Sequence, residues 1–201
     1  MSYRWIRSVG LAVVIAAIAA LSLQWPASTS PTAAPLTHIL RDEHPGPRSV
    51  HHGALGEADG AVPNGTTIFD EEVPGVGKLD ADLLGAVRRA AADSGVPFHV
   101  DSGWRSPAYQ ERLLREAVSK YGSEAEAARW VATPDRSAHV SGDAVDIGSS
   151  GAAWLSEHGA AYGLCQIYAN EPWHYELRPE AVENGCPPTY ADPAQDPRMQ
   201  Q

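Results

Sequence analysis

Three side chains that can bind a metal ion lie far apart along this chain: His139, Asp146 and His174. Two imidazoles and one carboxylate suit a tetrahedral zinc ion whose fourth position is left open for water. Zinc lowers the pKa of such a water to about 7, so the water can act as a nucleophile at neutral pH. If the three residues share one ion, the chain must fold so that they converge. The group therefore indicates a hydrolytic zinc site.

The residues around two of these ligands alternate in polarity as a half-buried strand does. Val145 and Ile147 are apolar and flank Asp146, and the apolar Tyr175 follows His174. Successive side chains of a strand point to opposite faces of its sheet. We therefore expect two strands that bury their apolar residues and turn Asp146 and His174 away from the core.

Glu171 precedes His174 by an odd number of residues, so on one straight strand the two would face opposite ways. Pro172 lies between them and cannot donate a ladder hydrogen bond. We therefore expect Glu171 in the preceding loop, from which its carboxylate can reach the metal. A solvated loop carboxylate remains the alternative.

A third motif runs from Ser102 through Gly103, Trp104 and Arg105 to Ser106, with Gln110 five residues after the arginine. Together the three motifs resemble those of VanY-type zinc D-alanyl-D-alanine carboxypeptidases, which trim bacterial cell-wall peptides. The resemblance covers roughly residues 77–178. Trp104 stands where that family usually has Tyr.

The resemblance implies a role for each motif residue. His139, Asp146 and His174 would bind zinc, Glu171 would be the catalytic base, Arg105 would polarise the scissile carbonyl, and Ser137 and Gln110 would lie in the substrate pocket. Arg105 could instead pair with Asp101, and Ser137 could simply cap a turn. The implied reaction is hydrolysis of the terminal D-Ala-D-Ala bond of peptidoglycan stem peptides.

Three other functions fit the same residues. The site could act on free D-Ala-D-Ala as a dipeptidase, or on an L-Ala-D-Glu type bond as an endopeptidase. The domain could also be a zinc-stabilised module that binds cell wall without turnover. The presence of Glu171 and Arg105 argues against the last of these.

Composition fits one catalytic domain with extra terminal sequence. Of the 201 residues, 43% are hydrophobic and 20% charged, which is enough apolar sequence for a core. The formal net charge of −10 repels phosphate backbones, and no stretch rich in Lys and Arg overcomes it. We therefore expect no nucleic-acid partner. We also expect a monomer.

The N-terminus has the pattern of an export signal. Arg4 and Arg7 precede an apolar run over residues 9–23, as the charged and apolar regions of a signal peptide do. We expect residues 1–27 to engage the membrane during export and then to be cleaved or to remain as an anchor. The protein would be extracytoplasmic, either secreted or membrane-anchored at the bacterial cell surface.

The remaining boundaries follow from composition. Residues 28–76 are rich in Pro and lack periodicity, which predicts an extracytoplasmic linker. Residues 77–186 would form the catalytic domain and 187–201 a flexible tail. Cys165 and Cys186 can pair in an exported domain and would then tie the tail across the catalytic strands, although two separate thiols remain an alternative.

Periodicity and capping residues predict the elements of the domain. Helices are expected over 81–91, 107–121, 123–131 and 151–161, and strands over 96–100, 144–147, 165–169 and 173–177. Helices followed by paired short strands indicate an α+β fold. We expect a small antiparallel sheet flanked by helices, with the zinc site on strand ends and loops.

Overall fold

The structure is a computed structural model that describes residues 55–200. Its helices are α1 Pro74–Gly77, α2 Ala81–Ser94, α3 Pro107–Tyr121, α4 Glu124–Ala127, α5 Ala138–Ser141, α6 Ser149–His158 and α7 Ala181–Asn184. Its strands are β1 Val100–Ser102, β2 Ala144–Ile147, β3 Leu164–Gln166 and β4 His174–Leu177. Short 3-10 helices are η1 Glu57–Asp59, η2 Gly159–Tyr162, η3 Pro193–Gln195 and η4 Pro197–Met199.

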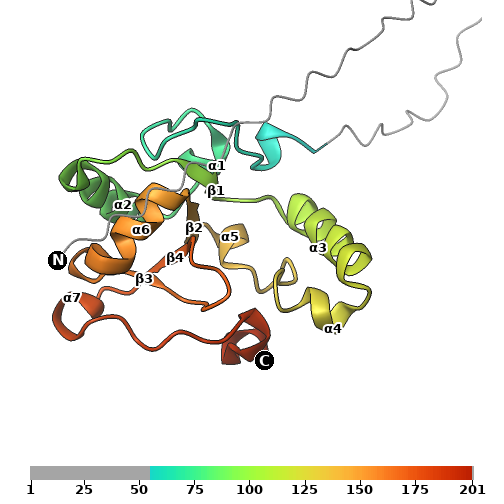
Figure 1. Ribbon diagram of the computed structural model, residues 1–201. Coiled ribbons are helices and arrows are strands. Elements are labelled where there is room, and N and C mark those ends of the chain that lie inside the picture. Colours follow the sequence, from blue (N-terminus) through green and yellow to red (C-terminus); the bar gives the residue numbers. More distant parts are fainter. Residues whose placement is uncertain (1–54, 201) are drawn as a thin grey trace, which may run out of the picture. The chain divides into compact units, whose positions relative to one another are not determined.

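The four strands form one antiparallel sheet in the order β1-β2-β4-β3. Figure 1 shows this sheet between α2 and α6 on one side and α3, α4 and α5 on the other. The α+β class with a small antiparallel sheet flanked by helices is therefore confirmed.

One face of the sheet carries the core. Val145, Ile147 and Tyr175 point to this face, and each is fully buried. Leu83 and Val87 of α2 belong to the same apolar cluster. Burying a side chain of this size stabilises a fold by roughly 1.5–3 kcal/mol. The apolar residues that flank Asp146 and follow His174 therefore hold the two strands in place.

The two long predicted helices are confirmed. In α2 the carboxylate of Asp80 accepts hydrogen bonds from the backbone N–H groups of Asp82 and Leu83, as an N-cap does. Gly95, at φ 70°, ends the helix in the left-handed conformation. The helix predicted over 123–131 is shorter, because α4 spans only Glu124–Ala127.

The first strand begins later than expected. Of the expected range 96–100, only Val100 belongs to β1, where it pairs with Ile147. On the other edge, Ile68 N–H donates to the Phe98 carbonyl and Val100 N–H donates to the Thr66 carbonyl. An antiparallel bridge joins Thr67 to His99. A segment assigned to the linker therefore adds to this edge.

The predicted linker boundary at residue 76 is wrong for its last part, since residues 55–76 pack on the domain. Ile68, Val73 and Val76 are buried in the main apolar cluster. Gly103, in the third motif, lies so close to this segment that a Cβ there would overlap the carbonyl oxygen of Gly75. The segment showed no period because its buried apolar residues are spread over turns and the one-turn helix α1.

The predicted flexible tail is also wrong for the described residues 187–200. Asp192 and Asp196 are buried, and Arg198 forms ion pairs with Glu176 and Asp196. Figure 1 shows the chain after α7 running past the β3–β4 loop to the C-terminus. Polar side chains help to fix this segment, so its polar composition did not indicate that it is part of the folded domain.

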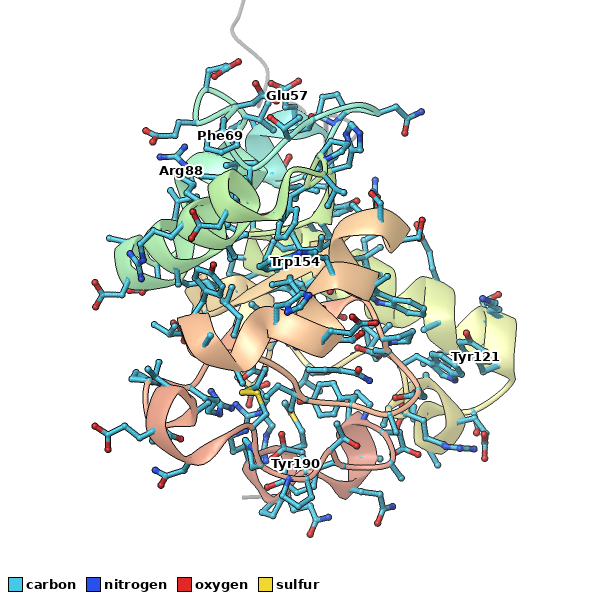
Figure 2. All side chains as sticks on the ribbon, turned by 60° about the vertical axis from the view of Figure 1, so that its left-hand side comes forward. Glu57, Phe69, Arg88, Tyr121, Trp154 and Tyr190 are labelled. Atoms are coloured by element: carbon cyan, nitrogen blue, oxygen red, sulfur yellow. A yellow bond between two sulfur atoms is a disulfide. The ribbon has the colours of Figure 1, made fainter. Side chains whose placement is uncertain are left out.

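Cys165 of β3 is bonded to Cys186, so the predicted pairing is confirmed. The bond, drawn in yellow in Figure 2, fixes the start of the C-terminal segment to the sheet. The predicted signal or anchor, residues 1–27, lies outside the described residues. In the part that the structure describes, no helix has the length and apolar character to cross a membrane.

Ile68 tests whether residues 55–76 belong to the folded domain. Ile68→Ala should lower the free energy of unfolding by about 2–5 kcal/mol, because it opens a cavity in the core. Phe69→Ala is the matched control: Phe69 is 56% exposed and lies on the surface beside Arg88 (Figure 2). It should change stability by less than about 1 kcal/mol. Equal small effects in urea unfolding would contradict the placement of this segment.

Candidate metal centre

Asp146 and His174 face each other across the central pair of strands. The antiparallel register of β2 and β4 pairs Asp146 with His174, and cross-strand partners project to the same face. That face is opposite to the one that carries the core. The predicted orientation of the two side chains is therefore confirmed.

The imidazole of His139 completes the group from the short helix α5. His139 Nδ1 lies 2.8 Å from the carbonyl oxygen of Gly103, an acceptor that fixes the proton on Nδ1. Its Nε2 then faces Asp146, 3.4 Å from Oδ1. Burial lowers the pKa of His139, which favours the neutral ring that a metal requires.

His174 presents its other nitrogen. Its Nδ1 lies 3.1 Å from Asp146 Oδ1, while its Nε2 lies 3.3 Å from Glu176 Oε1. Burial alone would lower the pKa of His174, but the hydrogen bonds to the two carboxylates outweigh it and raise the pKa to about 9. A metal ion would therefore replace a proton on Nδ1.

The three side chains fit the geometry of a small divalent ion. They are buried, and one ligand atom from each lies within 4.8 Å of the others. Ligand atoms about 2.1 Å from a tetrahedral ion stand about 3.4 Å apart. The separations of 3.1 and 3.4 Å from Asp146 Oδ1 to the two imidazoles match that spacing. The described residues thus contain a group that can hold a metal.

Asp146 stays ionised in this group. Burial raises its pKa, but His139 and His174 outweigh that effect and hold the pKa well below its usual range. Arg105 Nη2 also donates to Asp146 Oδ2, over 3.0 Å. The carboxylate therefore keeps its charge in a buried setting.

Glu171 lies in the loop before β4, as expected. Its Oε2 is 4.0 Å from His174 Nδ1, and the residue is 7% exposed. Burial raises the pKa of Glu171 to about 7, and attraction to His174 opposes part of that rise. A carboxylate with a pKa near neutrality can both accept and donate a proton. The solvated-loop alternative does not fit this burial.

Arg105 lies in the loop between β1 and α3, where three acceptors hold it. Its Nε donates to Ser102 Oγ over 2.8 Å and its Nη1 to Gln110 Oε1 over 3.1 Å. Its third acceptor is Asp146, so pairing with Asp101 is not the arrangement found. Gln110 is 1% exposed. Its side-chain amide accepts from Arg105 through Oε1 and donates to the carbonyl of Ala132 through Nε2. Gln110 therefore fixes the direction of the guanidinium.

A cavity of about 350 Å³ opens over the metal ligands. Glu171, Arg105, Ser137 and Gln110 line it together with the three ligands. Its lining also includes aromatic residues, among them Trp173 and the stacked pair Tyr121 and Trp130. Ser137 precedes α5 at the N-cap position, but its side chain makes no capping hydrogen bond. All the site residues expected from sequence therefore meet at one cavity.

Sequence reasoning gave no role to Glu176, which is 1% exposed and accepts from His174. Burial raises the pKa of Glu176, but hydrogen bonds from His174 and Arg198 outweigh it and lower the pKa. The signal was present, because Glu176 is two residues from His174 on one strand and shares its face. Arg198 gave no such signal, since its partner lies far away in the sequence.

The sequence profile of the VanY family, described as D-alanyl-D-alanine carboxypeptidase, matches residues 78–180, just over half of the chain. The chain belongs to the VanY family. The match contains the three ligands, Glu171 and Arg105, which meet at the cavity. It ends before the C-terminal segment that carries Arg198.

Individual relatives match part of the chain. A D-alanyl-D-alanine carboxypeptidase of Enterococcus faecalis is 34% identical over 120 residues, which cover 47% of this chain and 43% of that protein. The structure of VanYB in complex with D-alanine-D-alanine is 29% identical, with a TM-score of 0.47 over 53% of this chain and 74% of that one. An L,D-carboxypeptidase, DacB from Streptococcus pneumoniae, is 30% identical, with a TM-score of 0.41 over 52% and 67%. This VanY-family chain thus spans less than half of the enterococcal protein.

The ligand group predicts about one divalent metal ion per chain. His139→Ala and His174→Ala should each abolish stoichiometric binding, because two remaining ligands do not hold a tetrahedral ion. His99→Ala, which changes an exposed imidazole, is the control and should bind as the unaltered protein does. Metal analysis of the purified variants measures this. Full metal content in either ligand variant would contradict the assignment.

Proposed function

We propose that this protein is a zinc-dependent D-alanyl-D-alanine carboxypeptidase that removes the terminal D-alanine of peptidoglycan stem peptides. The observation that carries the proposal is the buried Glu171 beside a two-histidine, one-aspartate ligand group, with its Oε2 4.0 Å from His174 Nδ1. Membership of the VanY family supports the same reaction.

His139 through Nε2, one oxygen of Asp146, and His174 through Nδ1 would hold the ion. Bound there, zinc would lower the pKa of a coordinated water to about 7 and polarise the scissile carbonyl. The hydrogen bonds of His139 to Gly103 and of His174 to Glu176 keep the correct nitrogen of each ring turned to the ion.

Glu171 moves the protons of the reaction. Its carboxylate takes a proton from the attacking water and then gives it to the amine of the departing D-alanine. Burial raises the pKa of Glu171 in the metal-free site, which favours acceptance of a proton by its carboxylate. Glu171 is buried beside His174, so its carboxylate stays close to the ligand group.

Arg105 stabilises the negative charge that develops on the carbonyl oxygen during attack. Its guanidinium is held by Ser102 and Gln110 and lines the cavity, so it is oriented before the substrate binds. We assign it to the carbonyl oxygen, where a preorganised donor stabilises the charge that forms during attack. Ser137 is the candidate for direct substrate contact, whereas Gln110 acts by holding Arg105.

The domain and location follow from the same reasoning. We propose a catalytic domain that includes residues 55–76 and the C-terminal segment, preceded by an export signal or anchor over residues 1–27. The disulfide between Cys165 and Cys186 supports an oxidising, extracytoplasmic setting at the cell surface.

Glu171→Gln separates catalysis from metal binding. The variant should keep its full zinc content, while kcat falls by about 10²–10⁴-fold, because the amide cannot accept the proton. Glu183→Gln, on exposed α7, is the control and should leave kcat unchanged. Release of D-alanine from a synthetic pentapeptide measures turnover. Loss of zinc together with activity would make Glu171 a ligand or a structural residue.

Product analysis separates the proposed reaction from its alternatives. The account predicts release of D-alanine from a pentapeptide that ends in D-Ala-D-Ala. Cleavage of free D-Ala-D-Ala alone would make the protein a dipeptidase, and loss of D-alanine from a tetrapeptide alone would make it an L,D-carboxypeptidase. Release of L-alanine would indicate an endopeptidase. Binding of zinc and cell wall without any product would indicate a non-catalytic module.

A further inference from the structure

The chain after the disulfide, residues 186–200, is here called the C-terminal strap. It is fixed at its start by Cys186 and in its middle by Tyr190, whose backbone N–H donates to the Ile167 carbonyl and whose carbonyl accepts from Ala169 N–H. Figure 2 shows Tyr190 at the edge of the molecule that this strap covers. The strap therefore lies against the β3–β4 loop, which carries Glu171.

Arg198, near the end of the strap, reaches the buried carboxylate of Glu176. Its Nη1 donates to Oε2 over 2.8 Å and its Nη2 to Oε1 over 3.1 Å. Two parallel hydrogen bonds of this kind fix both distance and orientation. The fully buried Asp196 holds Arg198 in place, because both of its carboxylate oxygens accept hydrogen bonds from Arg198 Nε.

Glu176 joins this pair to the metal centre. The oxygen that accepts from Arg198 Nη2 is the same Oε1 that lies 3.3 Å from His174 Nε2. An acceptor at Nε2 leaves Nδ1 as the nitrogen that faces Asp146. The direction of the His174 ring therefore depends on where the carboxylate of Glu176 is held.

Arg178 also contacts Glu176 but does not fix the orientation of its carboxylate. It donates from Nη2 to Oε2 alone, over 2.6 Å, and lies two residues away on the chain. It leaves Oε1 free to rotate with the carboxylate. Only the fork of Arg198 holds both oxygens, so the two arginines make different predictions.

We propose that Arg198 is a positioning residue of the metal centre, acting from the strap through Glu176 to fix the ring of His174. The strap lies beyond residues 78–180, the part matched by the family profile. This inference goes beyond the proposed reaction, because it concerns how the ligands are held and not which peptide is cut. It can be tested without any substrate.

The experiment measures the zinc dissociation constant of the purified full chain by competition with a chromogenic chelator. Arg198→Gln should weaken zinc binding by about 10-fold, the lower end of the 10–100-fold that is typical for loss of a direct partner of a metal-bound histidine, because Glu176 itself remains. Arg178→Gln should stay within about threefold of the unaltered protein, because the fork of Arg198 remains. Arg198→Lys keeps the charge without the fork and should recover part of the loss.

A second control separates positioning from general loosening of the strap. Arg129→Gln removes the bond from Arg129 Nε to Asp192 Oδ2, at 2.9 Å, which also fixes the strap but does not touch Glu176. It should leave the zinc dissociation constant within about twofold. The absorption of bound Co²⁺ gives an independent signature, because a displaced His174 changes the spectrum of the ion.

The outcomes are distinct. Zinc binding by Arg198→Gln as tight as that of the unaltered chain would overturn the inference. Equal weakening in Arg129→Gln would also overturn it, since the strap as a whole would then be responsible. If Arg198→Gln does not fold, Arg198→Lys decides the question: weaker zinc binding with an altered Co²⁺ spectrum supports positioning, and unchanged values contradict it. Failure of the proposed peptidase activity would leave these results as they stand.

Discussion

The register between β2 and β4 is the constraint on which the metal centre depends. It sets Asp146 opposite His174 on one face of the sheet, while Val145 and Tyr175 anchor the same strands in the core on the other face. A slip of either strand by one residue would turn its own ligand into the core and its own apolar residue out, so that Asp146 and His174 would no longer share a face. The apolar contacts that stabilise the sheet therefore also enforce the geometry of the site.

Two buried carboxylates, Asp146 and Glu176, each have several positively charged or hydrogen-bonding partners. Asp146 is shared by Arg105, His139 and His174, and Glu176 is shared by His174 and two arginines. A buried carboxylate without partners would be costly, and removing one partner leaves an uncompensated charge. His174 joins the two groups through its two nitrogens. The ligand set, the base and the C-terminal strap are thus parts of one polar network.

Local patterns in the sequence predicted what local physics determines. Alternation assigned the facing of Asp146 and His174, and Pro172 placed Glu171 in the loop before β4. Other features depend on partners that are distant in the chain. The helix α5 that carries His139 is one turn long and leaves no period, and the burial of Ile68 depends on packing that composition does not reveal. Arg198 is held by polar partners that are distant in the sequence, so its segment resembled a solvated tail.

The most direct test of the account is the location of the ion in crystals of the zinc-loaded protein, by anomalous scattering at the zinc edge. The account predicts one ion, about 2.0–2.2 Å from His139 Nε2, from an oxygen of Asp146 and from His174 Nδ1, with the fourth position open to solvent. An ion bound away from these three atoms, or held by Nε2 of His174 in place of Nδ1, would contradict it.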